Sequence, residues 1–145
     1  MKEIYTKWHE IFPNKGSGVG KKFPWLLEVI KQFNPKSILD FGYGKGGTAD
    51  FIEEELKISV KKYDKGFPKY NILPTSVFDL VYSADVFEHI EFEDIENTLN
   101  TVMDLTTCKH IHIIDLSPAK KKLPDGRNAH VSLFNKEEWI NIFCK

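Results

Sequence analysis

The chain has 145 residues, close to the most common size of a single domain, so we expect one hydrophobic core and no second domain with separate chemistry. Apolar residues make up 41% and charged residues 28%, a composition that excludes a disordered or collagen-like chain. The 20 basic and 21 acidic residues nearly cancel, so no overall field draws the chain onto nucleic acid or an anionic membrane.

The sequence shows neither a membrane span nor a secretory leader. The apolar run Ile111–Leu116 is interrupted by His112 and Asp115 and is far shorter than the roughly 20 residues that a span needs. The first residues lack the apolar stretch and small-residue cleavage site of a signal peptide. Cys108 and Cys144 are too far apart to indicate a disulfide framework or a metal-ligand spacing. We therefore expect a cytoplasmic protein that has no membrane partner.

The first 34 residues predict two helices joined by a glycine-rich linker. Ile4–Phe12 has apolar residues at helical spacing and ends before Pro13. The second helix begins at Pro24 and continues to Phe33. The linker GSGVGKK resembles a P-loop, but lysines stand at the positions of the leading glycine and of the magnesium-binding hydroxyl residue. We expect a mobile loop there instead.

From residue 36 onward, short apolar strands alternate with helical stretches. The predicted strands are Ser37–Phe41, Ile58–Tyr63, a brief Tyr70–Leu73, Phe78–Ser83 and His110–Leu116. The predicted helices are Thr48–Leu56, Phe92–Leu105 and Lys136–Phe143. This alternation predicts right-handed crossovers and a Rossmann-like, doubly wound, mostly parallel sheet of about five strands. Such sheets bind ligands in the loops after the strands, here 42–47, 64–67, 84–89 and 117–130.

The loop after the first strand carries the clearest functional pattern. The strand SILDF leads into GYGKGG and then into a helix, which lets backbone amides approach an anionic or polar ligand. Gly42, Gly44 and Gly47 fit the dinucleotide pattern GxGxxG, and Asp64 follows about 20 residues later, where a ribose-binding acid is expected. The stretch Asp40–Gly46 fits DxGxGxG instead.

The motifs ILDFGYGKG and FDLVYSADVFEHI carry a resemblance to a known family. They resemble the first motif and the fourth strand of the class I S-adenosylmethionine-dependent methyltransferases, and the resemblance covers residues 36–117. It implies binding of S-adenosylmethionine and methyl transfer to a small molecule, a protein or an RNA. The alternatives are an NAD-dependent oxidoreductase, against which Asp40 argues because that position is small or apolar in nicotinamide fingerprints, and a non-catalytic module that binds S-adenosylmethionine.

The resemblance also implies roles for individual residues. Asp64 would accept hydrogen bonds from both ribose hydroxyls, and Asp40 would orient the glycine loop or receive the ammonium of the cofactor. Asn71 would pair with the adenine amino group. The complete predicted cofactor site is Asp40, Gly42, Tyr43, Gly44, Gly46, Asp64, Asn71, Ala84 and Asp85.

The resemblance divides the single domain, 1–145, into three parts. Residues 1–34 would include a lid over the cofactor, residues 36–117 the cofactor-binding core, and residues 118–145 an acceptor-side loop and the last helix. The family sheet has seven strands and closes with a hairpin that this sequence lacks. We therefore expect a minimal form or a fragment with an exposed sheet edge, which a second copy of the chain covers in a homodimer.

Polar residues after the fourth and fifth strands are the predicted acceptor site. The Asn/Asp-Pro-Pro-aromatic motif of methyltransferases acting on nucleic-acid bases is absent, which argues against a DNA base as the acceptor. His89 and His130 are candidate general bases, since histidine titrates near neutral pH, although His89 equally fits a structural role at a helix start. Glu88, Arg127 and Asn128 are the candidate substrate-binding residues, and Arg127 could clamp a carboxylate or phosphate.

One histidine pair resembles part of a metal site. His110 and His112 lie on one face of a predicted strand, because side chains two residues apart point the same way. No third ligand has a suitable spacing in the sequence. We therefore predict that both are ordinary strand histidines and that the protein has no metal site.

Overall fold

The structure is a computed structural model that describes residues 24–144. The predicted helix at 4–12, the glycine-rich linker and the lid lie outside the described residues. The helices are α2 (Pro24–Phe33), α3 (Thr48–Leu56), α4 (Phe92–Asp104) and α5 (Lys136–Phe143), with short 3-10 helices η2 (Pro68–Tyr70) and η3 (Phe87–His89). The strands are β1 (Ile38–Phe41), β2 (Val60–Tyr63), β3 (Phe78–Ala84) and β4 (Thr106–Ile113).

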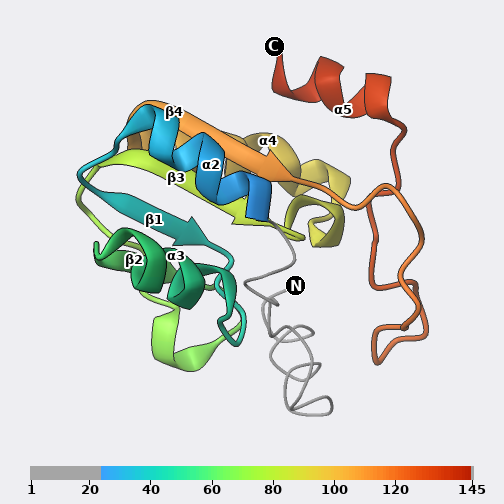
Figure 1. Cartoon of the computed structure of the whole chain (residues 1–145). Coiled ribbons are helices and arrows are strands. Elements are labelled where there is room, and N and C mark those ends of the chain that lie inside the picture. Colours follow the sequence, from blue (N-terminus) through green and yellow to red (C-terminus); the bar gives the residue numbers. More distant parts are fainter. Residues whose placement is uncertain (1–23, 145) are drawn as a thin grey trace.

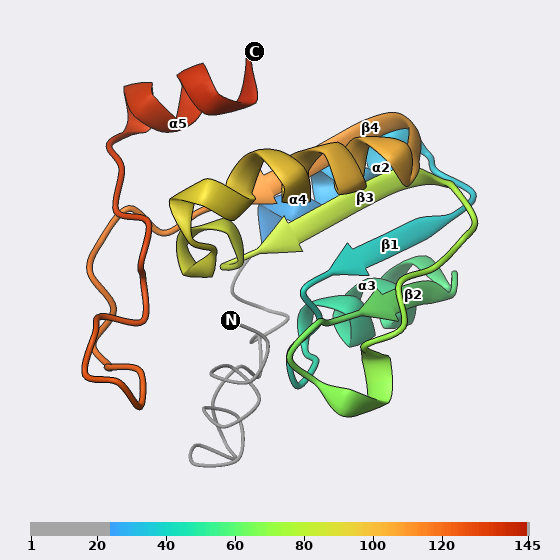
Figure 2. The ribbon, with the colours of Figure 1, turned by 180° about the vertical axis from the view of Figure 1, so that it is seen from behind.

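The strands form one parallel sheet in the order β2-β1-β3-β4, so the predicted Rossmann-like α/β fold is confirmed. Helices α2 and α3 cover one face of this sheet and α4 covers the other, as the two opposite views show (Figures 1 and 2). Because both faces of the central strands are covered, the strand sequence ILDF is buried at every position. The sheet is therefore the rigid frame from which the functional loops emerge.

The two faces of β1 divide the core into two layers. Ile38 packs with α2, α3 and Leu80 on one face, whereas Leu39 and Phe41 pack with α4 on the other. Alternation along the strand then places Asp40 on the α2/α3 face, opposite Tyr82 of β3 in the strand register. A carboxylate thus takes a position that the strand pattern otherwise gives to apolar side chains.

The predicted elements agree closely with the structure except at two places. The strand predicted at His110–Leu116 is β4, which begins at Thr106, because Thr106 pairs with Phe78 at the start of β3. It ends at Ile113, because that residue pairs with Ala84, the last residue of β3. The brief strand predicted at Tyr70–Leu73 is also wrong: Pro68 starts the 3-10 helix η2, whose Tyr70 carbonyl accepts from the backbone N–H of Asp64 at 2.9 Å.

Helix α5 lies beside β4 (Figure 1), and the ring of Phe143 stacks on His112 of β4 at 5.0 Å. Asn135 caps the helix by accepting from the backbone N–H of Glu138, whose side chain accepts from the backbone N–H of Asn135 in return. Trp139, 4% exposed, and Phe143 pack against Phe87 of η3 in a third apolar cluster. Among residues 24–144, no helix combines the length and apolar character that crossing a membrane requires.

Candidate functional site at the carboxyl edge of the sheet

The chain reverses its direction of strand addition between β1 and β3, and this switch point is where open parallel sheets bind ligands. The loops after β1 and β3 meet there. Gly42 has φ +102°, and a Cβ at this position would overlap the side chain of Val86. The glycine at position 42 therefore has a packing reason in addition to the predicted ligand contact, since Val86 covers its backbone.

The glycine loop is fastened to the end of β2 by Asp64. The Oδ2 atom of Asp64 accepts from the backbone N–H of Gly44 at 2.7 Å, and its Oδ1 atom accepts from Gly66 at 2.8 Å. The backbone N–H groups of Gly42 and Tyr43 donate to the carbonyl of Tyr63. Each carboxylate oxygen has a second lone pair, so Asp64 can hold the loop and still accept a ligand hydroxyl.

Tyr43 lies over the loop that contains it. A Cβ at Gly46 would overlap the Tyr43 hydroxyl, and the Tyr43 ring packs edge-on against Tyr70 at 4.7 Å. Lys62 lies 5.1 Å from the centre of the Tyr43 ring and forms an ion pair with Asp50 at 2.8 Å. These contacts tie together β2, α3 and η2 around the predicted cofactor loop.

Asp40 is a buried carboxyl directly beneath the loop. It is 4% exposed, and the Tyr82 hydroxyl donates to its Oδ2 atom at 2.7 Å. Burial raises the pKa of Asp40 to about 7, while the hydrogen bond from Tyr82 opposes this shift and the Asp64 carboxylate adds to it. At neutral pH this site can hold a proton or, once deprotonated, attract a cation.

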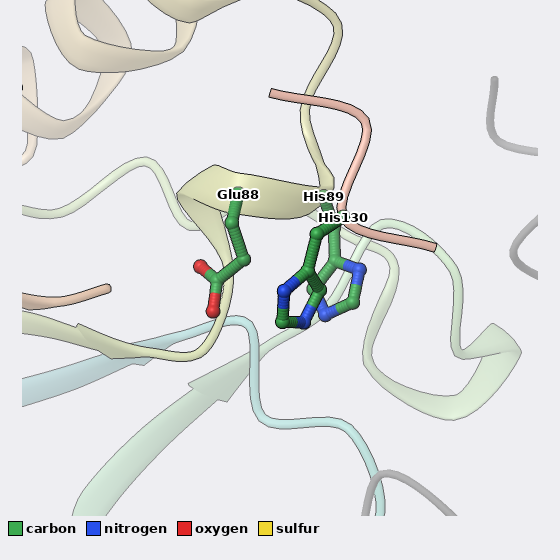
Figure 3. A group of neighbouring side chains, drawn as sticks. All are labelled: Glu88, His89 and His130. Atoms are coloured by element: carbon green, nitrogen blue, oxygen red, sulfur yellow. The ribbon is translucent and has the colours of Figure 1, made fainter. Parts of the chain in front are cut away.

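Three further side chains meet beyond the end of β3. Glu88 and His89 lie on η3, and His130 comes from the long loop that follows β4 (Figure 3). One ligand-type atom from each of the three residues lies within 4.8 Å of the others, and the two imidazole centres are 4.8 Å apart. The structure thus brings together both predicted general bases and a predicted substrate-binding residue.

Backbone carbonyls fix the orientation of both imidazoles. Nδ1 of His89 donates to the carbonyl of Ala129 at 2.7 Å, and Nδ1 of His130 donates to the carbonyl of Ser117 at 2.5 Å. A carbonyl oxygen only accepts, so each neutral ring carries its proton on Nδ1 and its lone pair on Nε2. A ring held in this way can act as a base or as a metal ligand through Nε2.

Glu88 is the most buried member of the cluster, with 0% exposure. Its Oε1 atom accepts from the backbone N–H of Asp115 at 3.0 Å, whereas its buried Oε2 atom has no hydrogen-bond partner among the described residues. Burial raises the pKa of Glu88 to about 7, against the opposing effect of the backbone N–H groups that donate to it.

The other two predicted acceptor residues are engaged within the protein. Arg127 donates to Glu91 at 2.6 Å and to Asp125 at 2.9 Å, so two carboxylates already occupy its guanidinium. Asn128 accepts from the backbone N–H groups of Ala119 and His130 and donates to the carbonyl of Ala119. Both side chains therefore shape the loop that presents His130, and their contact with a substrate stays a prediction.

The remaining predicted residues lie around the same edge. Ala84 ends β3, and Asp85, with φ +56°, turns the chain toward Val86 while its N–H donates to Ile113. Asn71 follows η2 and is half-buried. All three thus lie in the segments after η2 and β3, and their contact with the cofactor stays a prediction.

His110 and His112 on β4 form a separate chain of polar contacts with Ser83 of β3. His112 Nδ1 lies 2.7 Å from the Ser83 hydroxyl, and its Nε2 lies 3.0 Å from Nδ1 of His110. Burial lowers the pKa of His112 to about 3, with a further lowering from His110. The buried hydroxyl and the neutral ring are consistent with the predicted structural role.

Sequence reasoning identified Glu88, His89 and His130 singly but missed that they form a cluster. The reason is distance along the chain, because His130 reaches η3 only through a loop whose docking depends on tertiary contacts. No family model, curated protein or solved structure matches this chain.

Proposed function

We propose that the protein binds S-adenosylmethionine at the switch point and transfers its methyl group to an acceptor near η3. The observation that carries this proposal is the pair of carboxylates around the glycine loop, with Asp40 buried beneath it and Asp64 holding Gly44 from the end of β2. Two acids in these places suit a ligand that carries both cationic groups and ribose hydroxyls.

The residues present fit such a ligand in charge and in hydrogen-bonding capacity. Asp64 has lone pairs left for hydroxyl groups, and Asp40 is a titratable acid whose deprotonated form would attract a cation. Since Val86 covers Gly42 and the Tyr43 hydroxyl lies against Gly46, the proposed backbone contact comes from Gly44. The cofactor would supply an already activated methyl group, so the main task of the protein is to hold the reacting atoms in line and to exclude water.

The acceptor would meet the loop after β3 and the η3 cluster. His89 and His130 have fixed tautomers, so the Nε2 atom of either ring could take a proton from the acceptor. Asp85 and the deprotonated form of Glu88 add negative charge to the same region. In this proposal the cofactor extends from the switch point between β1 and β3 over the end of β2, and the acceptor lies beyond β3.

Calorimetry with S-adenosylhomocysteine and with NAD tests the proposal. We expect the wild-type chain to bind S-adenosylhomocysteine, Asp64→Ala to abolish binding, and Asp64→Asn to weaken it. Asp104→Ala is the matched control, because Asp104 is an exposed acid at the end of α4. Binding of NAD alone would indicate an oxidoreductase instead, and binding of neither ligand would refute the proposal.

A further inference from the structure

We infer that Glu88, His89 and His130 form a binding site for a divalent transition-metal ion such as Zn²⁺. The inference does not depend on methyl transfer, because it rests on the geometry of this cluster alone. Two imidazole nitrogens and one carboxylate oxygen are a ligand set that proteins use for catalytic zinc and for non-haem iron.

The hydrogen bonds of both histidines match those of metal ligands. A histidine that ligates through one nitrogen usually donates its other N–H to a carbonyl or carboxylate, which fixes the tautomer and the direction of the lone pair. Ala129 provides that carbonyl for His89 and Ser117 provides it for His130. Each imidazole thus has the outer contact that a metal ligand requires.

The Glu88 carboxyl supplies the second, independent observation. Its Oε2 atom is buried and has no hydrogen-bond partner among the described residues, although burying an unpaired polar oxygen destabilises a protein. Asp115 holds the other oxygen, so the carboxyl group is fixed in direction. A bound cation would satisfy Oε2 and compensate for the buried charge of the carboxylate.

The frame around the three side chains is rigid, as a preformed site requires. The backbone N–H of Ser132 donates to the carbonyl of Glu88 at 3.1 Å, and its hydroxyl donates to the carbonyl of Ile90 at 2.6 Å. Asn128 holds the backbone of His130 from the other side. The loop after β4 is therefore fastened to η3 through Ser132 and through the carbonyl of Ala129, which His89 contacts.

The spacing needs only a small adjustment to bind an ion. Ligands at about 2.1 Å from a tetrahedral zinc ion lie roughly 3.4 Å apart. The ligand-type atoms of the cluster lie within 4.8 Å of one another, so side-chain rotations that shorten the longest separation by about 1.4 Å complete the site.

The donor types decide which ions the site takes. Mg²⁺ and Ca²⁺ prefer oxygen ligands, whereas imidazole suits zinc, iron and neighbouring transition metals. Three protein ligands also leave a coordination position for water or for an oxygen or nitrogen of a substrate. When the ion is bound, Nε2 of His89 and of His130 serves as a ligand and is not a general base.

Metal binding to the full chain, stripped with a chelator, tests the inference. Isothermal titration with Zn²⁺ should show one ion per chain, Co²⁺ should give the visible absorption of a nitrogen- and oxygen-ligated site, and Mg²⁺ should not compete. Glu88→Gln keeps an acceptor for the backbone N–H of Asp115 but loses the carboxylate ligand, and His89→Gln loses an imidazole ligand. Each variant should weaken Zn²⁺ binding by more than about 100-fold. Loss of an outer contact alone typically weakens metal binding by about 10- to 100-fold, so a larger loss indicates a direct ligand.

His110→Gln is the matched control, because it removes an exposed histidine of the separate β4 pair. This variant should bind Zn²⁺ like the wild type. Equal affinity in the Glu88, His89 and His110 variants would overturn the inference, as would loss of binding in the His110 variant alone. Thermal melting in chelator shows whether each variant folds, and S-adenosylhomocysteine binding by the metal-free chain separates failure of this inference from failure of the proposed function.

Discussion

Replacing Asp40 with asparagine should remove a large pH dependence from the stability of the protein. The pKa of Asp40 rises from an ordinary 3.8 to about 7 in the folded chain, mainly because the carboxyl is buried. Between these two values the folded chain keeps a proton that the unfolded chain has lost. Stability therefore falls as the pH rises through this window.

The size of this effect follows from the difference of about three pH units between the two pKa values. At 1.36 kcal/mol for each unit, Asp40 lowers the free energy of unfolding by on the order of 4 kcal/mol between pH 4 and pH 8. Asparagine has nearly the same shape, can accept the hydrogen bond from Tyr82, and does not ionise.

Urea unfolding of the wild type and of Asp40→Asn at pH 5, 6, 7 and 8 measures the effect. Groups that both proteins share cancel in the difference, so the advantage of the asparagine variant should grow from pH 5 to pH 7 and level off above the folded pKa of about 7. Asp104→Asn, at an exposed position, is the matched control for replacing an acid by its amide. A difference for Asp40→Asn that does not change with pH would refute the assignment of a raised pKa to Asp40.

Three other outcomes are expected. Gly42→Ala should lower the free energy of unfolding by about 2 kcal/mol, because Gly42 has a positive φ and the added Cβ would overlap Val86. Urea unfolding should show a smaller loss when the same substitution is made in a Val86→Ala background. An equal loss in both backgrounds would contradict the contact between positions 42 and 86. Asn128→Ala should cost about 2 kcal/mol by leaving backbone groups of Ala119 and His130 unpaired, and hydrogen exchange should speed up at those two amides while the amides of β1 keep their protection. Sedimentation should detect a dimer formed along the β4 edge of the sheet, and a monomer at every concentration would dismiss that pairing.

Local patterns were sufficient to predict most of the sheet and its helices. Helical spacing between clear start and stop residues gave the bounds of α2, α3 and α5 without error. The start of β4 was missed because Thr106 and Thr107 are weakly apolar, and pairing with Phe78 rather than local hydrophobicity decides where the strand begins. Pro68 similarly favoured a turn where the sequence Tyr70–Leu73 suggested a strand.

The site was only partly accessible to the same reasoning. Strand ends predicted where Asp40, Asp64 and the glycines would lie, because parallel strands bring their carboxyl ends to one edge. Sequence spacing could not predict the ion pair between Glu91 and Arg127 or the proximity of His130 to Glu88, because both contacts join segments far apart in the sequence. Both contacts form because the loop after β4 packs against η3, and this packing depends on tertiary hydrogen bonds such as those of Ser132.

The attachment of α5 links the far end of the chain to the chemistry of the cluster. Phe87 packs against Phe143 and lies in one apolar cluster with Trp139, and it immediately precedes Glu88 and His89 in the chain. An ion that draws the two side chains of η3 together would also favour the seating of the last helix, and a seated helix would tighten the hold on the ion by the same factor. A partner that binds on the outside of the molecule and displaces α5 would therefore weaken ion binding and favour release of the ion.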